Sequence, residues 1–391
     1  MMSRAERTLV GDWWWTVDRA MLAGLATLMV TGLVLLMAGG PPAAERLGLS
    51  TFHFVSRQVL YLAPAVALMM AVSFLSVRHV RRLALLTYGI GMALVFAALQ
   101  WGPEIKGAHR WISIAGIGLQ PSEFVKPAFV VLAAWAFAEG ARRRDMPGAF
   151  LALMLLPATI VPLILQPDFG QTMLITVVWC GLFFIAGLHW FWVLGLGSGG
   201  ALGIGAAYRF LPHVRDRIER FLHKAMGDNG GKDGAKSVID NFQTETAMEG
   251  FLRGGWFGAG PGEGVAKRRL PDAHTDFIFA VTGEEFGVIV CIALVALFAF
   301  IVLRGLLLAQ RNEDTFCRLA AAGLVMMFGL QAAINMAVNV HLIPAKGMTL
   351  PFVSYGGSSL ISLALGMGFL IALTRRRPRA EIADRLGPMR L

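Results

Sequence analysis

The sequence is poor in charged residues, and this scarcity decides its class. Only 15% of the 391 residues are Asp, Glu, Lys or Arg, whereas hydrophobic residues make up 56%. The surface of a soluble domain needs about 25% charged residues. The sequence therefore excludes a soluble protein and indicates an integral membrane protein that crosses the bilayer several times.

Cysteine is scarce as well, and so are the signs of cofactor binding. Cys180, Cys291 and Cys317 are far apart, which fits neither a metal-ligand spacing nor a disulfide framework. The glycine-rich stretch GAGPGEG at 258–264 follows no predicted strand, which excludes a dinucleotide site and favours a flexible turn. We therefore expect no organic cofactor and no nucleic-acid partner.

Long apolar runs are what the sequence has in abundance. A bilayer span takes roughly 20 apolar residues, and ten runs meet that length. Because unpaired backbone groups are too costly in lipid, all ten are expected to be α-helices. The expected fold is all-α and polytopic, with spans near 18–39, 55–76, 82–101, 124–141, 148–166, 171–187, 189–210, 276–303, 316–340 and 355–374.

Arginine clusters set the orientation of these spans, because Lys and Arg in short loops stay on the cytoplasmic side. Every second short connection is basic, which places both termini in the cytoplasm. We expect a cytoplasmic segment at 1–17, a membrane domain at 18–374 with a long outer loop at 211–275 between spans seven and eight, and a basic tail at 375–391. The clusters are Arg78, Arg81 and Arg82; Arg142, Arg143 and Arg144; Arg304, Arg311 and Arg318; and Arg375, Arg376 and Arg377.

The stretch LPDAHTDFIFAVTGEEFG, residues 270–287, sets four carboxylates at the mouth of the eighth span. We expect Thr275 to cap a helix whose first turn contains Asp276, at headgroup depth on the outer side. Since that position faces water, Asp276 is the leading catalytic candidate. Glu284 and Glu285 would lie roughly 12–14 Å deeper. Either they pin a neighbouring helix through an ion pair, or they mark a functional site within the membrane.

Further polar residues are expected at the same outer level, and each alone has a structural explanation such as capping or turn formation. Together they indicate one outward-facing site, where cations hold a diphosphate and a carboxylate accepts a proton or holds a divalent metal ion. The basic residues of the long outer loop form either a solvated surface or a landing site for an anionic ligand. The candidate substrate-binding residues are Lys106, His109, Arg110, Glu123, Lys126, Asp168, Gln171, His274, Lys346 and Ser354.

Five motifs occur in order along the spans. They are KGAHRWI, QPSEFVKPAF, QPDFGQ, LPDAHTDFIFAVTGEEFG and IPAKGMTLPFVSYGGSS. In this order the sequence resembles the SEDS family of bacterial shape, elongation, division and sporulation proteins, over about residues 15 to 380. The TGEEFG motif and the last motif are more similar to the cell-division branch of that family than to its elongation branch.

The resemblance implies a peptidoglycan glycosyltransferase that polymerises lipid II at the outer face of the bacterial cytoplasmic membrane, at the division septum, and releases undecaprenyl diphosphate. It implies that Asp276 is the essential acid, and that Arg110, Glu123 and Lys126 match further positions of the family. It also implies a class B penicillin-binding protein as partner, together with other division proteins. A divalent cation, Mg²⁺ or Mn²⁺, held by Asp276 is an open expectation.

Three alternatives stay open from the sequence. A lipid II flippase would also need many spans and polar residues between helices, an elongation polymerase would share the same motifs, and a scaffold would recruit the transpeptidase without chemistry. The polar residues concentrate on the outer face and few charges occupy the centres of spans, which favours the enzyme over the flippase.

Overall fold

The computed structural model describes residues 8–105, 108–114, 117–143, 145–187, 235–343 and 347–375, and single positions between 195 and 219. Nine helices of the described part match nine of the ten expected spans. The seventh expected span, 189–210, lies largely outside the described residues. The nine helices are α2 (Arg19–Arg46), α3 (His53–Ser73), α4 (Val77–Trp101), α5 (Pro121–Arg142), α6 (Gly148–Leu165), α7 (Phe169–Ile185), α12 (Ile278–Gln310), α13 (Thr315–Asn339) and α14 (Gly357–Thr374).

Eight of these helices are long and apolar enough to cross a membrane, and α7 is a shorter apolar helix. The protein is therefore a polytopic, almost entirely helical membrane protein, as the sequence predicts. The exception is a small antiparallel hairpin in the first outer loop, which the all-α expectation did not include. The remaining elements are α1 (Leu9–Thr16), β1 (Ile112–Ile114), β2 (Ile117–Leu119), α10 (Ala235–Gly254) and α11 (Ala266–Arg269).

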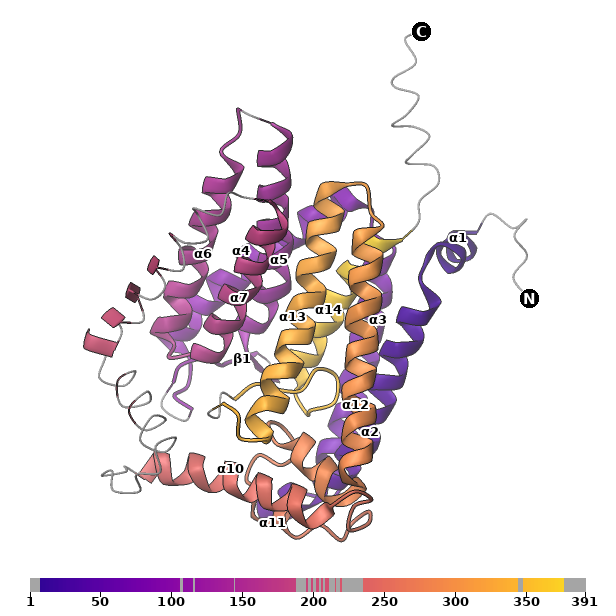
Figure 1. Cartoon of the computed structure of the whole chain (residues 1–391), viewed down its shortest axis with the longest axis vertical. Coiled ribbons are helices and arrows are strands. Elements are labelled where there is room, and N and C mark those ends of the chain that lie inside the picture. The colour runs from indigo at the N-terminus through magenta and orange to yellow at the C-terminus, as the bar shows by residue number, and fades with distance from the viewer. Residues whose placement is uncertain are drawn as a thin grey trace.

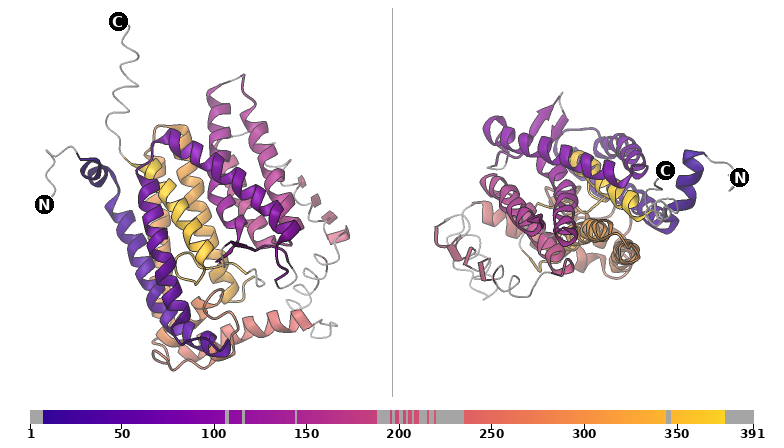
Figure 2. Two further views of the ribbon diagram at one scale, coloured as in Figure 1. Left: turned by 180° about the vertical axis from the view of Figure 1, so that it is seen from behind. Right: turned by 90° about the horizontal axis from the view of Figure 1, so that it is seen from above.

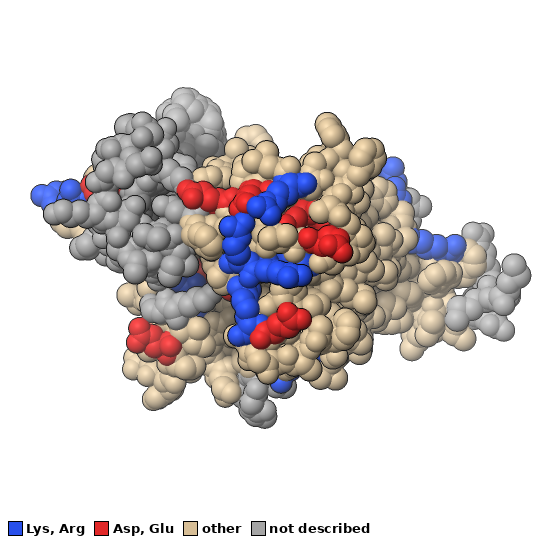
Figure 3. Space-filling view, turned by 90° about the horizontal axis from the view of Figure 1, so that it is seen from below, with Lys and Arg blue, Asp and Glu red and all other residues tan. Residues whose placement is uncertain are grey.

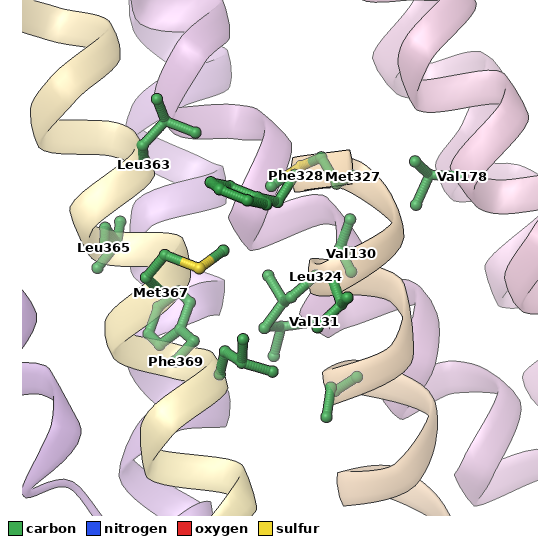
Figure 4. Packing of buried hydrophobic residues seen from close by; sticks show 14 of the residues in the cluster. Val130, Val131, Val178, Leu324, Met327, Phe328, Leu363, Leu365, Met367 and Phe369 are labelled. Carbon is green, nitrogen blue, oxygen red and sulfur yellow. The ribbon is translucent and has the colours of Figure 1, made fainter. Parts of the chain in front are cut away.

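The membrane helices form one bundle with α5, α13 and α14 at its centre (Figures 1 and 2). Side chains of α5, α13 and α14, among them Val130, Leu324, Phe328 and Met367, meet in the apolar core that Figure 4 shows. The apolar core of the bundle is thus built around α5, α13 and α14. The polar network of the candidate site involves the same three helices.

The short basic connections define the two ends of the bundle. Arg78 lies in the first turn of α4 and Arg142 in the last turn of α5, while Arg311 and Arg375 directly follow α12 and α14. These positions are at one end of the bundle, where α1 and the end of α14 also lie (Figure 1). By the positive-inside rule that end is cytoplasmic. The helix α10 lies across the opposite, outer end, where it packs against α12.

Candidate functional site

Asp276 lies in a turn before α12 and not in the first turn of a helix. α12 begins at Ile278, and the Thr275 hydroxyl donates to the Asp272 carbonyl (3.3 Å) instead of capping the helix. The expected helix start was therefore wrong. The physical reason is that the main-chain N–H groups of Thr275 and Phe277 also donate to the Asp272 carbonyl (3.1 and 3.2 Å), which closes a tight turn. Asp276 is half-buried at the end of that turn.

The segment before α14 fixes the two residues that precede Asp276. The main-chain N–H of Tyr355 donates to the carbonyl of His274 (2.9 Å), and the hydroxyl of Ser354 donates to the carbonyl of Thr275 (2.5 Å). The Ser354 hydroxyl also accepts from the N–H of Leu350 (2.8 Å). Ser354 is buried and holds the backbone beside the candidate acid.

Two asparagines of α13 fix Asp276 itself. The side-chain amides of Asn335 and Asn339 both donate to the carbonyl of Asp276 (2.9 and 2.8 Å). Asn335 also donates to the carbonyl of Met348 (2.6 Å), and the Asn339 side-chain oxygen accepts from the N–H of Ala280 (3.0 Å). Three consecutive carbonyls, from His274 to Asp276, are thus held by α13 and by the segment before α14.

Gln331 continues this polar stripe one turn further along α13, since positions i, i+4 and i+8 share one helix face. Its side-chain oxygen accepts from the ammonium of Lys126 (3.0 Å), and its amide donates to the carbonyl of Thr349 (3.1 Å). Lys126 also forms an ion pair with Glu123 (2.8 Å). The stripe of Gln331, Asn335 and Asn339 therefore connects the charged start of α5 to the Asp276 turn.

Glu123 extends the network towards α7. The amide of Gln171 donates to the Glu123 carboxylate (2.6 Å), and the N–H of Gln171 donates to Asp168, the N-cap residue of α7 (3.4 Å). Arg110 approaches the Asp168 carboxylate at 3.9 Å, and its guanidinium donates to the carbonyls of residues 166 and 167. Burial raises the pKa of Asp168, while the charge of Arg110 opposes that rise.

The structure therefore brings together many of the predicted site residues, but in two different environments. Glu123, Lys126, Asp168, Gln171 and Ser354 are all buried. The first four are linked to one another by hydrogen bonds and an ion pair, whereas Ser354 bonds to the turn before Asp276. Arg110 retains 27% side-chain exposure, so within the described part of the network it is the more accessible cation.

The remaining predicted residues lie around this network. His109 is exposed and its Nδ1 donates to the carbonyl of Gly102 (2.7 Å). His274 is buried, and its ring stacks on Phe54 with ring centroids 4.0 Å apart. Lys106 and Lys346 lie outside the described residues.

Glu284 holds the outer loop to α12. Its carboxylate accepts from the N–H groups of Val265 and Ala266 (both 2.6 Å) and of Lys267 (3.1 Å), the residues where α11 begins. The carboxylate side chain therefore satisfies backbone donors that a helix start leaves open, where its charge is also favoured.

Glu285 anchors the same loop through an ion pair. It pairs with the ammonium of Lys267, and both side chains are buried. Its second carboxylate oxygen accepts from the N–H of Gly262 (3.0 Å). The sequence leaves two roles open for Glu284 and Glu285, a structural ion pair and a functional site within the membrane. The structure supports the structural role, although the segment that is held is the outer loop and not a neighbouring helix.

A break at Gly287 divides α12, so the expected continuous helix is in fact two. Gly287 has φ +83° and ψ 172°. The carbonyls freed at Glu284 and Glu285 accept from Ala259 and Gly260 (2.9 and 3.1 Å). On the far side of the break, the N–H groups of residues 288 and 289 donate to the carbonyls of residues 255 and 256. Residues 255–260, which include the beginning of the glycine-rich stretch, therefore form a turn that fills the break.

Basic side chains form a band across the outer end of the molecule, with acidic side chains beside it (Figure 3). In the outer loop, Arg253 and Arg269 both pair with Glu249 (2.6 and 2.7 Å), and Lys267 is buried against Glu285. Arg268 is exposed. Three of the loop cations are thus neutralised by acidic side chains of the protein. For these three, this favours the interpretation that they belong to a solvated surface over a landing site for an anionic ligand.

Sequence reasoning missed the stripe of Gln331, Asn335 and Asn339. The signal was present, because three amides spaced by four residues occur within an otherwise apolar run, and polar side chains inside a span face a protein interior or a functional site.

Taken together, these features define an integral membrane protein with a charged, largely buried network that leads to a half-buried carboxylate at the outer end. The family described as cell cycle protein, which unites FtsW, RodA and SpoVE, matches residues 18–378. The chain belongs to this family.

Individual relatives agree with that assignment. The chain is 44% identical over 379 residues to the "Probable peptidoglycan glycosyltransferase FtsW" of Caulobacter vibrioides, covering 97% of this chain and 94% of the relative. It is 35% identical to the protein of the same name from a Thioalkalivibrio strain, over 92% and 90% of the two chains.

Two solved structures share the fold. A chain of a peptidoglycan synthase complex that coordinates polymerization and crosslinking aligns with a TM-score of 0.74 at 26% identity, over 92% of this chain and 97% of that one. The rod shape determining protein RodA of Thermus thermophilus aligns with a TM-score of 0.64, also at 26% identity, over the same fractions.

Proposed function

We propose that this protein is a peptidoglycan glycosyltransferase that polymerises lipid II at the outer face of the cytoplasmic membrane. Two relatives that bear the name of that activity are 44% and 35% identical to this chain over more than nine-tenths of its length. The observation that carries the proposal is the placement of Asp276. Its carboxylate lies at the outer end of the bundle, on a backbone segment that four hydrogen bonds from other elements hold in place.

In the proposed reaction, Asp276 accepts the proton of the 4-hydroxyl of an acceptor GlcNAc. The hydroxyl oxygen forms a bond to the anomeric carbon of a donor MurNAc, and the bond from that carbon to the diphosphate oxygen breaks. General-base assistance of this kind contributes roughly 10² to 10⁴-fold. The hydrogen bonds that hold the backbone at residues 274–276 assist this step. Catalysis by a base depends on holding its carboxylate within reach of the proton.

Negative charge develops on the departing undecaprenyl diphosphate. Arg110, as the accessible cation of the network, is placed to bind a diphosphate oxygen through charge-assisted hydrogen bonds. Lys126 is only 2% exposed and already shared by Glu123 and Gln331, so we assign it a supporting role in this conformation.

A divalent cation is compatible with this site. Among the described residues no three His, Cys, Asp or Glu side chains gather as a metal-ligand set. Mg²⁺ needs no such set, since it is often bound by one or two carboxylates together with substrate phosphates and water. Asp276 would then hold the ion, which would neutralise charge on the diphosphate.

The proposed setting is the division septum, with a class B penicillin-binding protein that crosslinks the new strands. The relatives named FtsW and the structural similarity to a synthase that couples polymerization to crosslinking support this setting. An elongation role is the closest alternative, given the similarity to RodA.

A flippase is the competing class. It would have to move a charged headgroup past the centres of the spans. Glu284 or Glu285 would be the residues expected to interact with the headgroup on the way. Both carboxylates are buried and engaged with the outer loop, which favours the transferase.

The test is glycan synthesis by detergent-solubilised protein, which has no two compartments to flip between. With lipid II and a cognate penicillin-binding protein whose transpeptidase site is blocked, we expect glycan chains, fewer of them after chelation if a metal takes part. Absence of polymer under all partner and metal conditions, together with lipid II translocation in liposomes, would establish the flippase instead.

A further inference from the structure

An apolar corner of the outer loop lies on the outside of the bundle beside α12. Leu252, Trp256 and Phe257 are exposed by 78%, 66% and 84%. They sit at the end of α10 and in the turn that fills the break at Gly287. Exposure of large apolar side chains that are close together in a chain marks a surface that interacts with something.

The hydrogen bonds across the break fix the depth of this corner. The carbonyl of Trp256 accepts from the N–H of Ile289 (3.3 Å), so the turn lies level with that residue of α12. Ile289 is 15 residues before Arg304 and 22 before Arg311, which is about 22 and 33 Å of helix. The hydrocarbon core of a bilayer is about 30 Å thick. With those arginines at the cytoplasmic surface, Ile289 and Trp256 lie near the outer boundary of the core, between about 8 Å inside it and about 3 Å beyond it.

The corner is also continuous with the lipid-facing side of α12. Ile289, Ile292 and Val295 follow each other at three-residue spacing and are 47%, 56% and 44% exposed. This stripe has to contact acyl chains if the helix crosses the membrane. Trp256 therefore extends the surface of the stripe outward, to the depth at which tryptophan is enriched in membrane proteins.

We propose that Leu252, Trp256 and Phe257 form a membrane anchor that inserts into the acyl-chain and headgroup boundary of the outer leaflet. Main-chain hydrogen bonds and one short helical segment connect the anchor to the Asp276 turn. The turn at 255–260 binds the carbonyls of Glu284 and Glu285, and the helical segment 278–286 leads directly back to Asp276. The leaflet thereby sets the depth of the Asp276 turn relative to lipid headgroups.

The anchor is tested by the depth of a fluorescent label. Cys180→Ser, Cys291→Ala and Cys317→Ala give a cysteine-free background, and Phe257→Cys carries an environment-sensitive dye. The full-length protein is placed in phosphatidylcholine and phosphatidylglycerol vesicles that contain nitroxide lipids labelled at the headgroup, at carbon 5 or at carbon 12. Glu263→Cys, exposed in the same loop, and Val295→Cys, on the lipid-facing stripe, are the matched controls.

We expect the Phe257→Cys label to be quenched at least about twofold more than the Glu263→Cys label, most strongly by the headgroup and carbon 5 nitroxides. The Val295→Cys label should respond most to carbon 12. A label at Ala259→Cys should lose quenching when Trp256→Ser and Phe257→Ser are added. Equal quenching at 257 and 263 would overturn the anchor. Loss of quenching at 257 on adding the crosslinking partner would also overturn it, because the occupant would then be a protein.

Discussion

The side-chain amide of Asn339 donates a hydrogen bond of 2.8 Å to the main-chain carbonyl of Asp276. The oxygen of the same side chain accepts from the N–H of Ala280, in the first turn of α12. A single uncharged side chain of α13 thus joins the turn that carries the carboxylate to the helix that follows it. The position of the Asp276 carboxylate depends on that bridge.

Asn339→Ala should lower glycan synthesis by about 10- to 100-fold, since a displacement of about 1 Å at a reacting group is costly. The loss should appear mainly in kcat, measured with purified protein and lipid II. Asn312→Ala is the matched control, because Asn312 makes the same kind of bond to the carbonyl of Leu373 at the cytoplasmic end (2.9 Å). Equal losses of activity in the two variants would mean that Asn339 acts only on stability.

Glu285→Gln should destabilise the outer loop, because it leaves the buried ammonium of Lys267 without its counter-charge. Breaking a buried pair by removing one partner costs about 3–5 kcal/mol, whereas replacing both partners is often tolerated. The double variant Lys267→Met with Glu285→Gln should therefore melt at a higher temperature than Glu285→Gln alone. A double variant that is less stable than the single one would show that the pair does not hold the loop.

Gly287→Ala should strongly reduce thermal stability. A Cβ atom at Gly287 would lie 2.3 Å from the carbonyl oxygen of Trp256, in addition to the strain of a positive φ. Gly262→Ala is the control for strain alone, since Gly262 has φ +90° and open space around it. Left-handed strain costs about 1–2 kcal/mol, so Gly262→Ala should lose only that much. Equal melting temperatures for both variants would contradict the close packing of the turn into the break.

Arg110→Ala should impair use of lipid II more than it impairs folding. Arg304→Ala is its matched control, because Arg304 pairs with Asp18 (2.6 Å) at the cytoplasmic end and is similarly half-exposed. Both variants should lose a small and comparable amount of stability. Only Arg110→Ala should raise the KM for lipid II, by about tenfold or more for a charge-assisted bond to diphosphate. A KM near that of the unaltered protein would leave Arg110 with a structural role.

The sequence predicts most of the helical fold and its orientation in the membrane. The reason is that the bilayer itself determines how long an apolar span must be and on which side arginines lie. The convergence of Glu123, Lys126, Asp168 and Gln171 was also anticipated, from their shared level at the outer ends of spans. What spacing does not reveal is which of these groups satisfy one another. Lys126 is predicted as a substrate-binding cation at the outer level, yet it is buried between Glu123 and Gln331.

The local structure around Asp276 was harder to anticipate. The helical pattern of apolar residues continues from Asp276 through the span. This pattern predicts neither the turn at residues 272–277 nor the break at Gly287. The turn is closed by local bonds to the Asp272 carbonyl, but Ser354 and Asn339 hold it from distant segments, and the turn at 255–260 fills the break. Contacts of that kind are decided by tertiary packing, which outweighs local propensity.

Whether the Asp276 carboxylate carries glycosyl transfer is tested most directly by Asp276→Asn in a purified assay of lipid II polymerisation with the crosslinking partner present. Asn keeps the size of the side chain and the main-chain carbonyl that Asn335 and Asn339 bind, but it cannot accept the proton. Asp272→Asn, in the same turn, is the control. We expect no glycan chains from Asp276→Asn and near-normal synthesis from Asp272→Asn, with both variants inserted and bound to the partner. Polymer from Asp276→Asn at the yield of the unaltered protein would contradict the catalytic role.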